Sequence, residues 1–123
     1  MKRRALIAIV AISLLTGCTV PAMNKAKLKE EPTSSFVKDR NYKVLAKYWD
    51  DNATKQTIDF KGASFMTIWE SDQIAEITIG NGPYYGMIEL RALSDTSTKV
   101  TTFERGTLSS RIQEWADLIK NAP

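Results

Sequence analysis

The sequence predicts an α+β fold, in which an antiparallel sheet of four to five strands is packed on one face by a short N-terminal helix and a longer C-terminal helix. Several short segments rich in β-branched and aromatic residues follow one another between residues 56 and 104. The turns between them are too short for anything but hairpins, which makes the sheet antiparallel. Apolar residues at helical spacing flank this region on both sides.

A short amphipathic helix is expected over residues 41–50. Asn41 can cap its first turn, because an Asn side chain accepts a hydrogen bond from a free backbone N–H there. Apolar residues then recur three or four positions apart, which is the spacing of one helix face. They are Tyr42, Leu45, Tyr48 and Trp49.

The predicted strands cover residues 36–37, 56–60, 64–70, 73–79, 84–92 and 98–104. Gly80-Asn81-Gly82-Pro83 is the strongest turn signal, since Gly and Asn tolerate positive φ. In the strand over residues 73–79, Ala75, Ile77 and Ile79 share one face. In the next, alternation places Tyr84, Gly86, Ile88, Leu90 and Ala92 inward and Tyr85, Met87, Glu89 and Arg91 outward. Gly86 indicates a β-bulge or, alternatively, a close approach to a ligand.

The C-terminal helix is expected to begin near Gly106 and Thr107. One apolar stripe runs along it, with members separated by four, three and four residues. The stripe consists of Leu108, Ile112, Trp115 and Ile119. The single α+β domain is therefore expected to cover residues 36–121.

The first 18 residues have a different character. Lys2, Arg3 and Arg4 precede an apolar run that is too short to cross a bilayer and has the length of a signal-peptide core. The run ends in Leu15-Thr16-Gly17-Cys18. Here the chain resembles the precursors of bacterial lipoproteins, whose lipobox is a Leu, two small residues and a Cys. The resemblance implies that residues 1–17 are a signal peptide and that Cys18 carries the lipid anchor.

Residues 18–35 comprise this cysteine and a polar, proline-containing segment, and they are expected to form a flexible tether. Removal of residues 1–17 leaves 14 basic and 14 acidic side chains in the mature chain. Its net charge of zero gives no support to nucleic-acid binding, which requires a basic surface.

Few side chains are suited to catalysis or metal binding. The chain contains no His, which excludes His-based triads and His metal sites, and its one Cys is expected to be acylated. Asp50 and Asp51 are neighbours that point in different directions from a helix end, so we do not expect a catalytic carboxylate pair. We predict no catalytic residue, metal site or cofactor.

Aromatic side chains are the remaining candidates for binding. The candidate residues are Trp49, Trp69, Tyr84 and Tyr85. Such rings either fill the core of a small domain or line a groove or a partner-binding patch.

These observations predict a non-catalytic envelope lipoprotein that is anchored through Cys18 to membrane lipid and binds a protein partner. The alternative is a binder of an apolar or cell-wall-derived ligand, held in a groove between the sheet and a helix. In enteric-type lipoproteins an Asp after the lipidated Cys retains the protein at the inner membrane. Thr19 stands there instead, so the resemblance implies the outer membrane, with the domain facing the periplasm. The segment from Met87 to the C-terminal helix is also similar to helix-grip lipid-binding domains and to small envelope lipoproteins.

Overall fold

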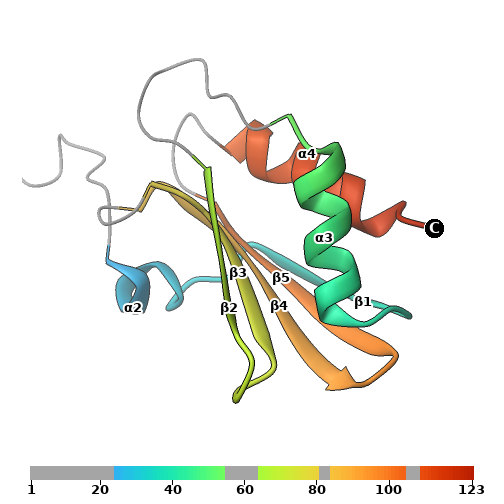
Figure 1. Ribbon diagram of the computed structural model, residues 1–123. Helices are drawn as coiled ribbons and strands as arrows, with labels where there is room; N and C mark the ends of the chain where they lie inside the picture. The colour runs from blue at the N-terminus through green and yellow to red at the C-terminus, as the bar shows by residue number, and fades with distance from the viewer. Residues whose placement is uncertain (1–23, 55–63, 81–83, 105–108) are drawn as a thin grey trace, which may run out of the picture.

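The computed structural model describes residues 24–54, 64–80, 84–104 and 109–123. They form a five-stranded sheet in the order β1-β5-β4-β3-β2, and every neighbouring pair is antiparallel. The strands are β1 (Ser34–Lys38), β2 (Ser64–Trp69), β3 (Ile74–Ile79), β4 (Gly86–Ser94) and β5 (Ser97–Glu104). The helices are α2 (Lys25–Leu28), α3 (Tyr42–Asn52) and α4 (Ser109–Lys120) (Figure 1). The predicted α+β class with an antiparallel sheet is confirmed.

Helix α3 begins as the sequence predicts. The Asn41 side chain accepts a hydrogen bond from the backbone N–H of Lys43 at 2.9 Å. The helix continues to Asn52, so Asp50 and Asp51 lie in its last turn rather than beyond it. Both carboxylates are exposed, and Asp51 pairs with Lys47 one turn earlier at 2.8 Å.

Strands β2 to β5 follow the chain as successive hairpins. Gln73 adopts a positive φ of 54° in the turn between β2 and β3. Asp95 and Thr96 form the turn between β4 and β5. The predicted strand at 56–60, the residues 81–83 of the predicted Gly-rich turn, and the predicted first turn of the C-terminal helix lie outside the described residues.

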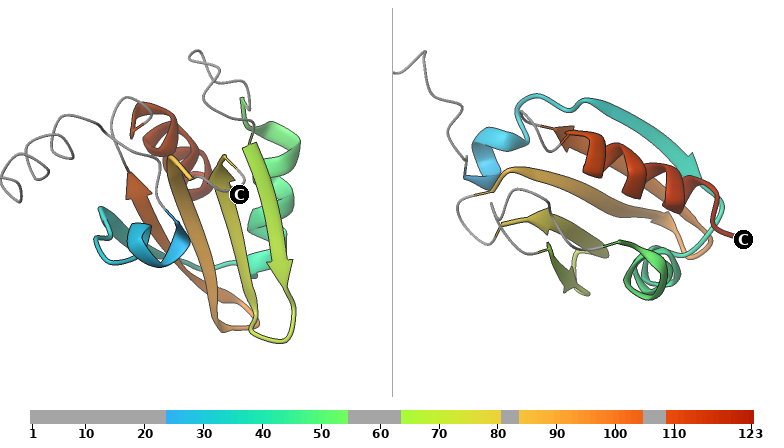
Figure 2. Two further views of the ribbon diagram at one scale, coloured as in Figure 1. Left: turned by 90° about the vertical axis from the view of Figure 1, so that its left-hand side faces the viewer. Right: turned by 90° about the horizontal axis from the view of Figure 1, so that it is seen from above.

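The main core lies between one face of the sheet and helices α3 and α4. Ala75, Ile77 and Ile79 of β3 contribute to it together, as their alternation predicts. Trp49 of α3 meets Trp115 of α4 edge to face, with 5.1 Å between the ring centroids. Figures 1 and 2 show these two helices lying against the sheet, whereas α2 lies apart from them on its other side.

Gly86 is explained by packing. A Cβ atom built on Gly86 would lie 2.9 Å from Cγ1 of Ile112 in α4, which is too close. The registers of β4 with β3 and with β5 both begin at Gly86, and the register shift in β4 lies between Ala92 and Ser94. The absent side chain lets α4 approach the sheet, and this contact accounts for the glycine.

The inward and outward assignment along β4 needs one correction. Ile88 and Leu90 are buried in the main core as predicted. Tyr84 and Tyr85 are reversed: Tyr85 packs against the main core, and Tyr84 packs against the opposite face. Strand β4 begins only at Gly86, so strand alternation does not extend to the two tyrosines.

The predicted tether over residues 18–35 is wrong from residue 24 onward, and the folded body begins before residue 36. Helix α2 lies on the face of the sheet opposite α3 and α4, and its Leu28 is fully buried there. Leu28 packs with Met87 and Phe103, and the partly buried Tyr84 completes this second cluster. Met87 was expected to face outward, and it is buried because α2 covers it.

Candidate binding site

The four predicted aromatic residues have separate positions in the fold. Trp49 is buried in the main core, and Tyr85 is partly buried against the same core. Trp69 is 38% exposed at the end of β2. The structure places Trp69 and Tyr84 near one cation, Lys25 of α2, whose Nζ lies 4.5 Å from the Trp69 ring centroid and 5.3 Å from that of Tyr84.

The two rings belong to a charged cluster on the sheet face that α2 covers. We call it the α2 site. Its members come from α2 and its C-cap residue, from β2, β3 and β4, and from the segment just before β4. They are Lys25, Lys29, Trp69, Glu76, Tyr84 and Glu89.

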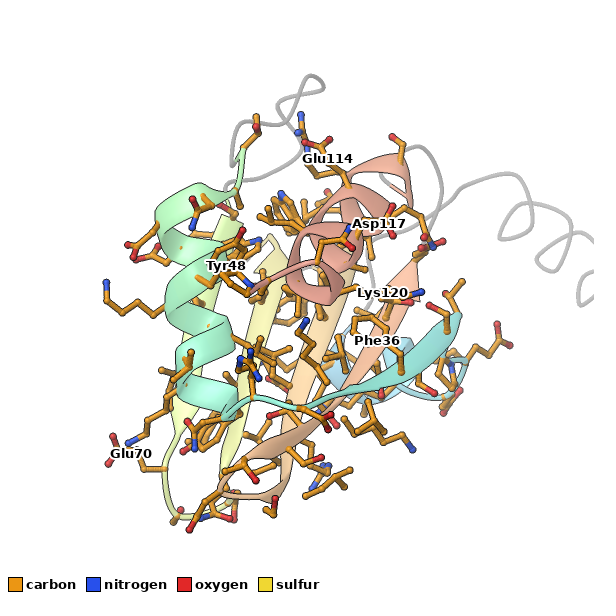
Figure 3. The ribbon with its side chains drawn as sticks, turned by 90° about the vertical axis from the view of Figure 1, so that its right-hand side faces the viewer. Phe36, Tyr48, Glu70, Glu114, Asp117 and Lys120 are labelled. Atoms are coloured by element: carbon orange, nitrogen blue, oxygen red, sulfur yellow. The ribbon has the colours of Figure 1, made fainter. Side chains whose placement is uncertain are left out.

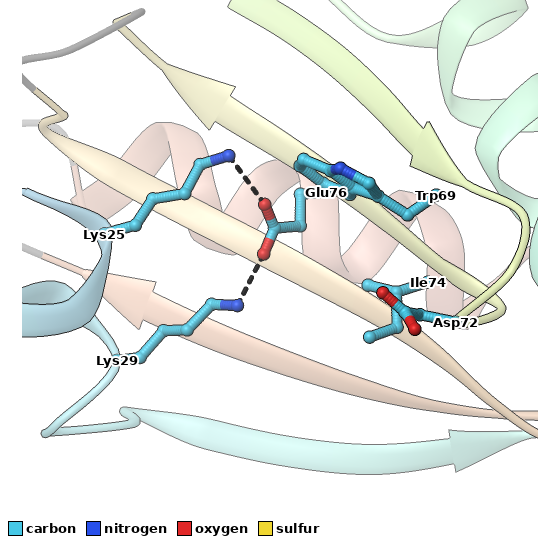
Figure 4. A pocket seen from close by; sticks show the side chains of 6 residues that line it. All are labelled: Lys25, Lys29, Trp69, Asp72, Ile74 and Glu76. Carbon is cyan, nitrogen blue, oxygen red and sulfur yellow. Dashed lines mark ion pairs between the residues drawn. The ribbon is translucent and has the colours of Figure 1, made fainter.

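Glu76 is the centre of the α2 site. Glu76 is only 3% exposed, and each of its two carboxylate oxygens faces an ammonium group. Lys25 Nζ lies 2.8 Å from Oε1, and Lys29 Nζ lies 2.6 Å from Oε2 (Figure 4). A buried carboxylate is costly without such partners, so the two lysines of α2 are needed where they stand.

A second carboxylate lies directly across the sheet. Glu89 of β4 is the register partner of Glu76 and is 9% exposed. Lys29 Nζ lies 3.1 Å from Glu89, so this one ammonium joins both carboxylates. Arg91 approaches Glu89 from the same strand, also at 3.1 Å.

Two titrating groups are perturbed at the α2 site. Burial acts to raise the pKa of Glu76, but the ammonium groups of Lys25 and Lys29 outweigh burial and hold the pKa below its ordinary value. Burial acts to lower the pKa of Lys29, yet Glu76 and Glu89 together raise it above its ordinary value. Both shifts favour the charged forms that hold α2 on the sheet.

A depression of about 260 Å³ adjoins this charge cluster. It is bounded by the two lysines and Glu76 on one side and by Trp69, Asp72 and Ile74 on the other (Figure 4). Helix α2 thus occupies only part of the concave surface, which continues toward the turn between β2 and β3.

A second depression, of about 290 Å³, lies where α3 ends beside α4. Trp115 and Leu118 give it apolar walls, and the Trp115 indole N–H donates to the Thr54 carbonyl at 2.8 Å. Glu114 and Asp117, labelled in Figure 3, add two carboxylates along α4. Asn52 and Asn121 also line it.

Sequence reasoning missed four residues of the α2 site: Lys25, Lys29, Glu76 and Glu89. A signal for the first pair was present, because Lys25, Leu28 and Lys29 have the spacing of one helix face. The pairing of Glu76 with Glu89 depends on the register of two strands, which the sequence does not state.

Cys18 lies outside the described residues. Within the described ranges, no group of three or more His, Cys, Asp or Glu side chains is placed to hold a metal ion. No helix in those same ranges has the length and apolar character needed to cross a membrane. No family model, curated protein or solved structure matches the chain.

Proposed function

We propose that the chain is a non-catalytic lipoprotein of the bacterial envelope, anchored through Cys18 and binding a protein partner close to the membrane. The lipobox supports the anchor. The observation that carries the position is that residue 24, six residues after Cys18, already belongs to the folded body. Six residues span at most about 20 Å, so the lipidated cysteine holds the α2 side of the domain near the headgroups.

Partner binding is supported by the surface around β2. Phe65, Ile68 and Trp69 are each more than one-third exposed on this edge strand, and the depression of the α2 site adjoins Trp69. Exposed aromatic side chains beside a concave, charged surface are typical of protein-binding sites.

The anchor is tested by Cys18→Ser in a bacterial host fed a labelled fatty acid. We expect the native chain to take up the label and to enter the membrane fraction, and the variant to lose both properties, because the sequence has no other cysteine. Thr19→Asp is the matched control, since it keeps the lipobox and is expected to shift the protein from the outer to the inner membrane. Unchanged labelling of Cys18→Ser would rule the anchor out.

A second candidate function is the binding of a cell-wall-derived ligand in the depression between α3 and α4. Its side chains combine an indole and a leucine with amides and carboxylates, which suits a polar fragment carrying amino or hydroxyl groups better than an acyl chain. Native mass spectrometry of the mature chain with muropeptides tests this candidate. A stoichiometric complex that Asp117→Asn weakens supports it, and the absence of any complex excludes it.

A further inference from the structure

The sheet face under α2 is unfavourable on its own. Strands β3 and β4 place Glu76 and Glu89 directly opposite each other, and like charges in this position destabilise a sheet. Met87 and Phe103 lie on the same face and would be open to solvent without α2. The face therefore requires a cover that is basic at its edge and apolar at its centre.

Helix α2 supplies this cover with three side chains. Leu28 enters the apolar cluster, Lys29 joins the two carboxylates, and Lys25 lies near the rings of Trp69 and Tyr84 while it pairs with Glu76. The three positions are i, i+3 and i+4 on one helix face. This face of the sheet therefore binds a helical turn that presents two basic side chains and one apolar side chain.

Two observations indicate that α2 is an exchangeable occupant. It is a single turn of four residues, too short to persist as a helix without its contacts. The side chains of Lys25 and Lys29 are 29% and 34% exposed, so solvent and competitors reach them.

The depression beside α2 shows that a longer occupant has room. It continues past Trp69 and Ile74 to Asp72, whose carboxylate lies in its wall. None of the α2 ion pairs involves Asp72. A longer segment with one more basic residue matches this acidic extension.

We propose that the α2 site is a docking site for a basic amphipathic segment of another protein, and that α2 is its intramolecular occupant. The segment carries a lysine or arginine at each position corresponding to Lys25 and Lys29, an apolar residue corresponding to Leu28, and a further basic residue that reaches Asp72. The inference deepens the proposed partner binding and does not depend on the lipid anchor. Fatty-acid labelling of Cys18 therefore tests the anchor separately.

Competition with α2 determines how binding is measured. Five residues connect α2 to β1, and a short connection of this kind gives a millimolar effective concentration. An external peptide binds weakly to the native chain for this reason, and it binds more tightly when α2 has lost its two lysines.

The test uses the mature chain with Cys18→Ser, which keeps it unlipidated. The probe is a fluorescein-labelled peptide with the sequence of residues 22–33, and binding is followed by fluorescence anisotropy at low salt. Lys25→Met/Lys29→Met removes both ammonium groups and keeps the apolar stems. Lys27→Met is the matched control, because Lys27 lies on α2 and its ammonium group, within the described residues, pairs with the exposed Glu30 rather than with the sheet.

We expect the double variant to bind the peptide at least about tenfold more tightly than Lys27→Met does. Binding should weaken as salt is added, and a peptide with both contacting lysines replaced by Gln should not bind. Equal affinity of the two folded variants overturns the proposal.

A measurement on the native chain decides the matter where the double variant fails to fold. Millimolar unlabelled peptide should displace α2, shift the backbone amide resonances of residues 25–28 and leave the buried indole N–H resonances of Trp49 and Trp115 in place; unmoved amide resonances in α2 overturn the proposal. Native dimers that disappear in Lys25→Met/Lys29→Met would also overturn it, because the occupant would then be α2 of a second copy.

Discussion

Replacing Leu28 by Ala tests whether residues 24–33 belong to the folded body. Leu28 is 0% exposed and packs with Met87 and Phe103. The substitution removes three carbon atoms from this cluster, which amounts to about 2 kcal/mol at about 0.8 kcal/mol for each buried methylene. A cavity could increase the loss, but a one-turn helix can leave the sheet, so the total is limited by what α2 contributes.

We therefore expect Leu28→Ala to lower the free energy of unfolding by about 2 kcal/mol. For a body of about 100 residues, this corresponds to a melting midpoint lower by about 8–16 °C. Urea denaturation followed by tryptophan fluorescence measures the change, and an unchanged m-value would show that the unfolded state is the same. Hydrogen exchange should accelerate first at the backbone amides of α2.

Leu93→Ala is the matched control, because Leu93 is 56% exposed in β4 and loses the same three carbon atoms. We expect its free energy of unfolding to stay within about 0.5 kcal/mol of the native value. A Leu28→Ala variant as stable as Leu93→Ala would refute the docking of α2 and restore the flexible tether predicted by the sequence.

Two further perturbations probe the core and the charge cluster. Trp115→Asp places a carboxylate in a fully buried position, and we expect a loss of more than about 3 kcal/mol, seen as the absence of a cooperative thermal transition. The lowered pKa of Glu76 stabilises the fold above its unfolded pKa of about 4.3, and this contribution disappears as the pH falls through the lower folded value. Urea midpoints of the native chain should therefore decrease below about pH 4.3 more steeply than those of Glu76→Gln, and parallel curves would contradict this assignment.

Periodicity predicted the parts of the fold whose side chains face a single large core. Each of these signals is repeated at several positions. In α4 the apolar stripe contains Ile112, Trp115 and Ile119, and in β3 apolar residues recur at every second position, as at Ile77 and Ile79. Helix α3 was predicted for the same reason, with Asn41 as its cap.

Helix α2 was missed because one turn contains no repeat. Its single buried apolar residue, Leu28, stands among lysines and glutamates, a composition that also describes a solvated tether. Its position depends on Met87 and Phe103, which are close to it only after β4 and β5 have paired.

The candidate aromatic site was predicted in part for a similar reason. Trp69 and Tyr84 do lie near the same cation, but this cation is Lys25, more than 40 positions earlier in the chain. Trp49 has the same composition signal as Trp69, yet it packs against Trp115 in the core. Residue type alone does not separate a core ring from a surface ring, because that distinction depends on which helix covers which face.

In the lipoprotein that we propose, the lipid anchor and the α2 site are coupled through the chain. With α2 docked, a lipidated Cys18 would hold the body within about 20 Å of the membrane, because residue 24 already belongs to the folded body. When a partner segment displaces α2, the next fixed element is β1 at Ser34, and sixteen residues span up to about 55 Å. A partner that occupies the α2 site therefore also releases the domain to extend away from the membrane. The docking of α2 and the distance of the domain from the membrane then change together in one equilibrium. The ion pairs of Glu76 shift this equilibrium toward the state in which α2 is docked and the domain lies close to the membrane.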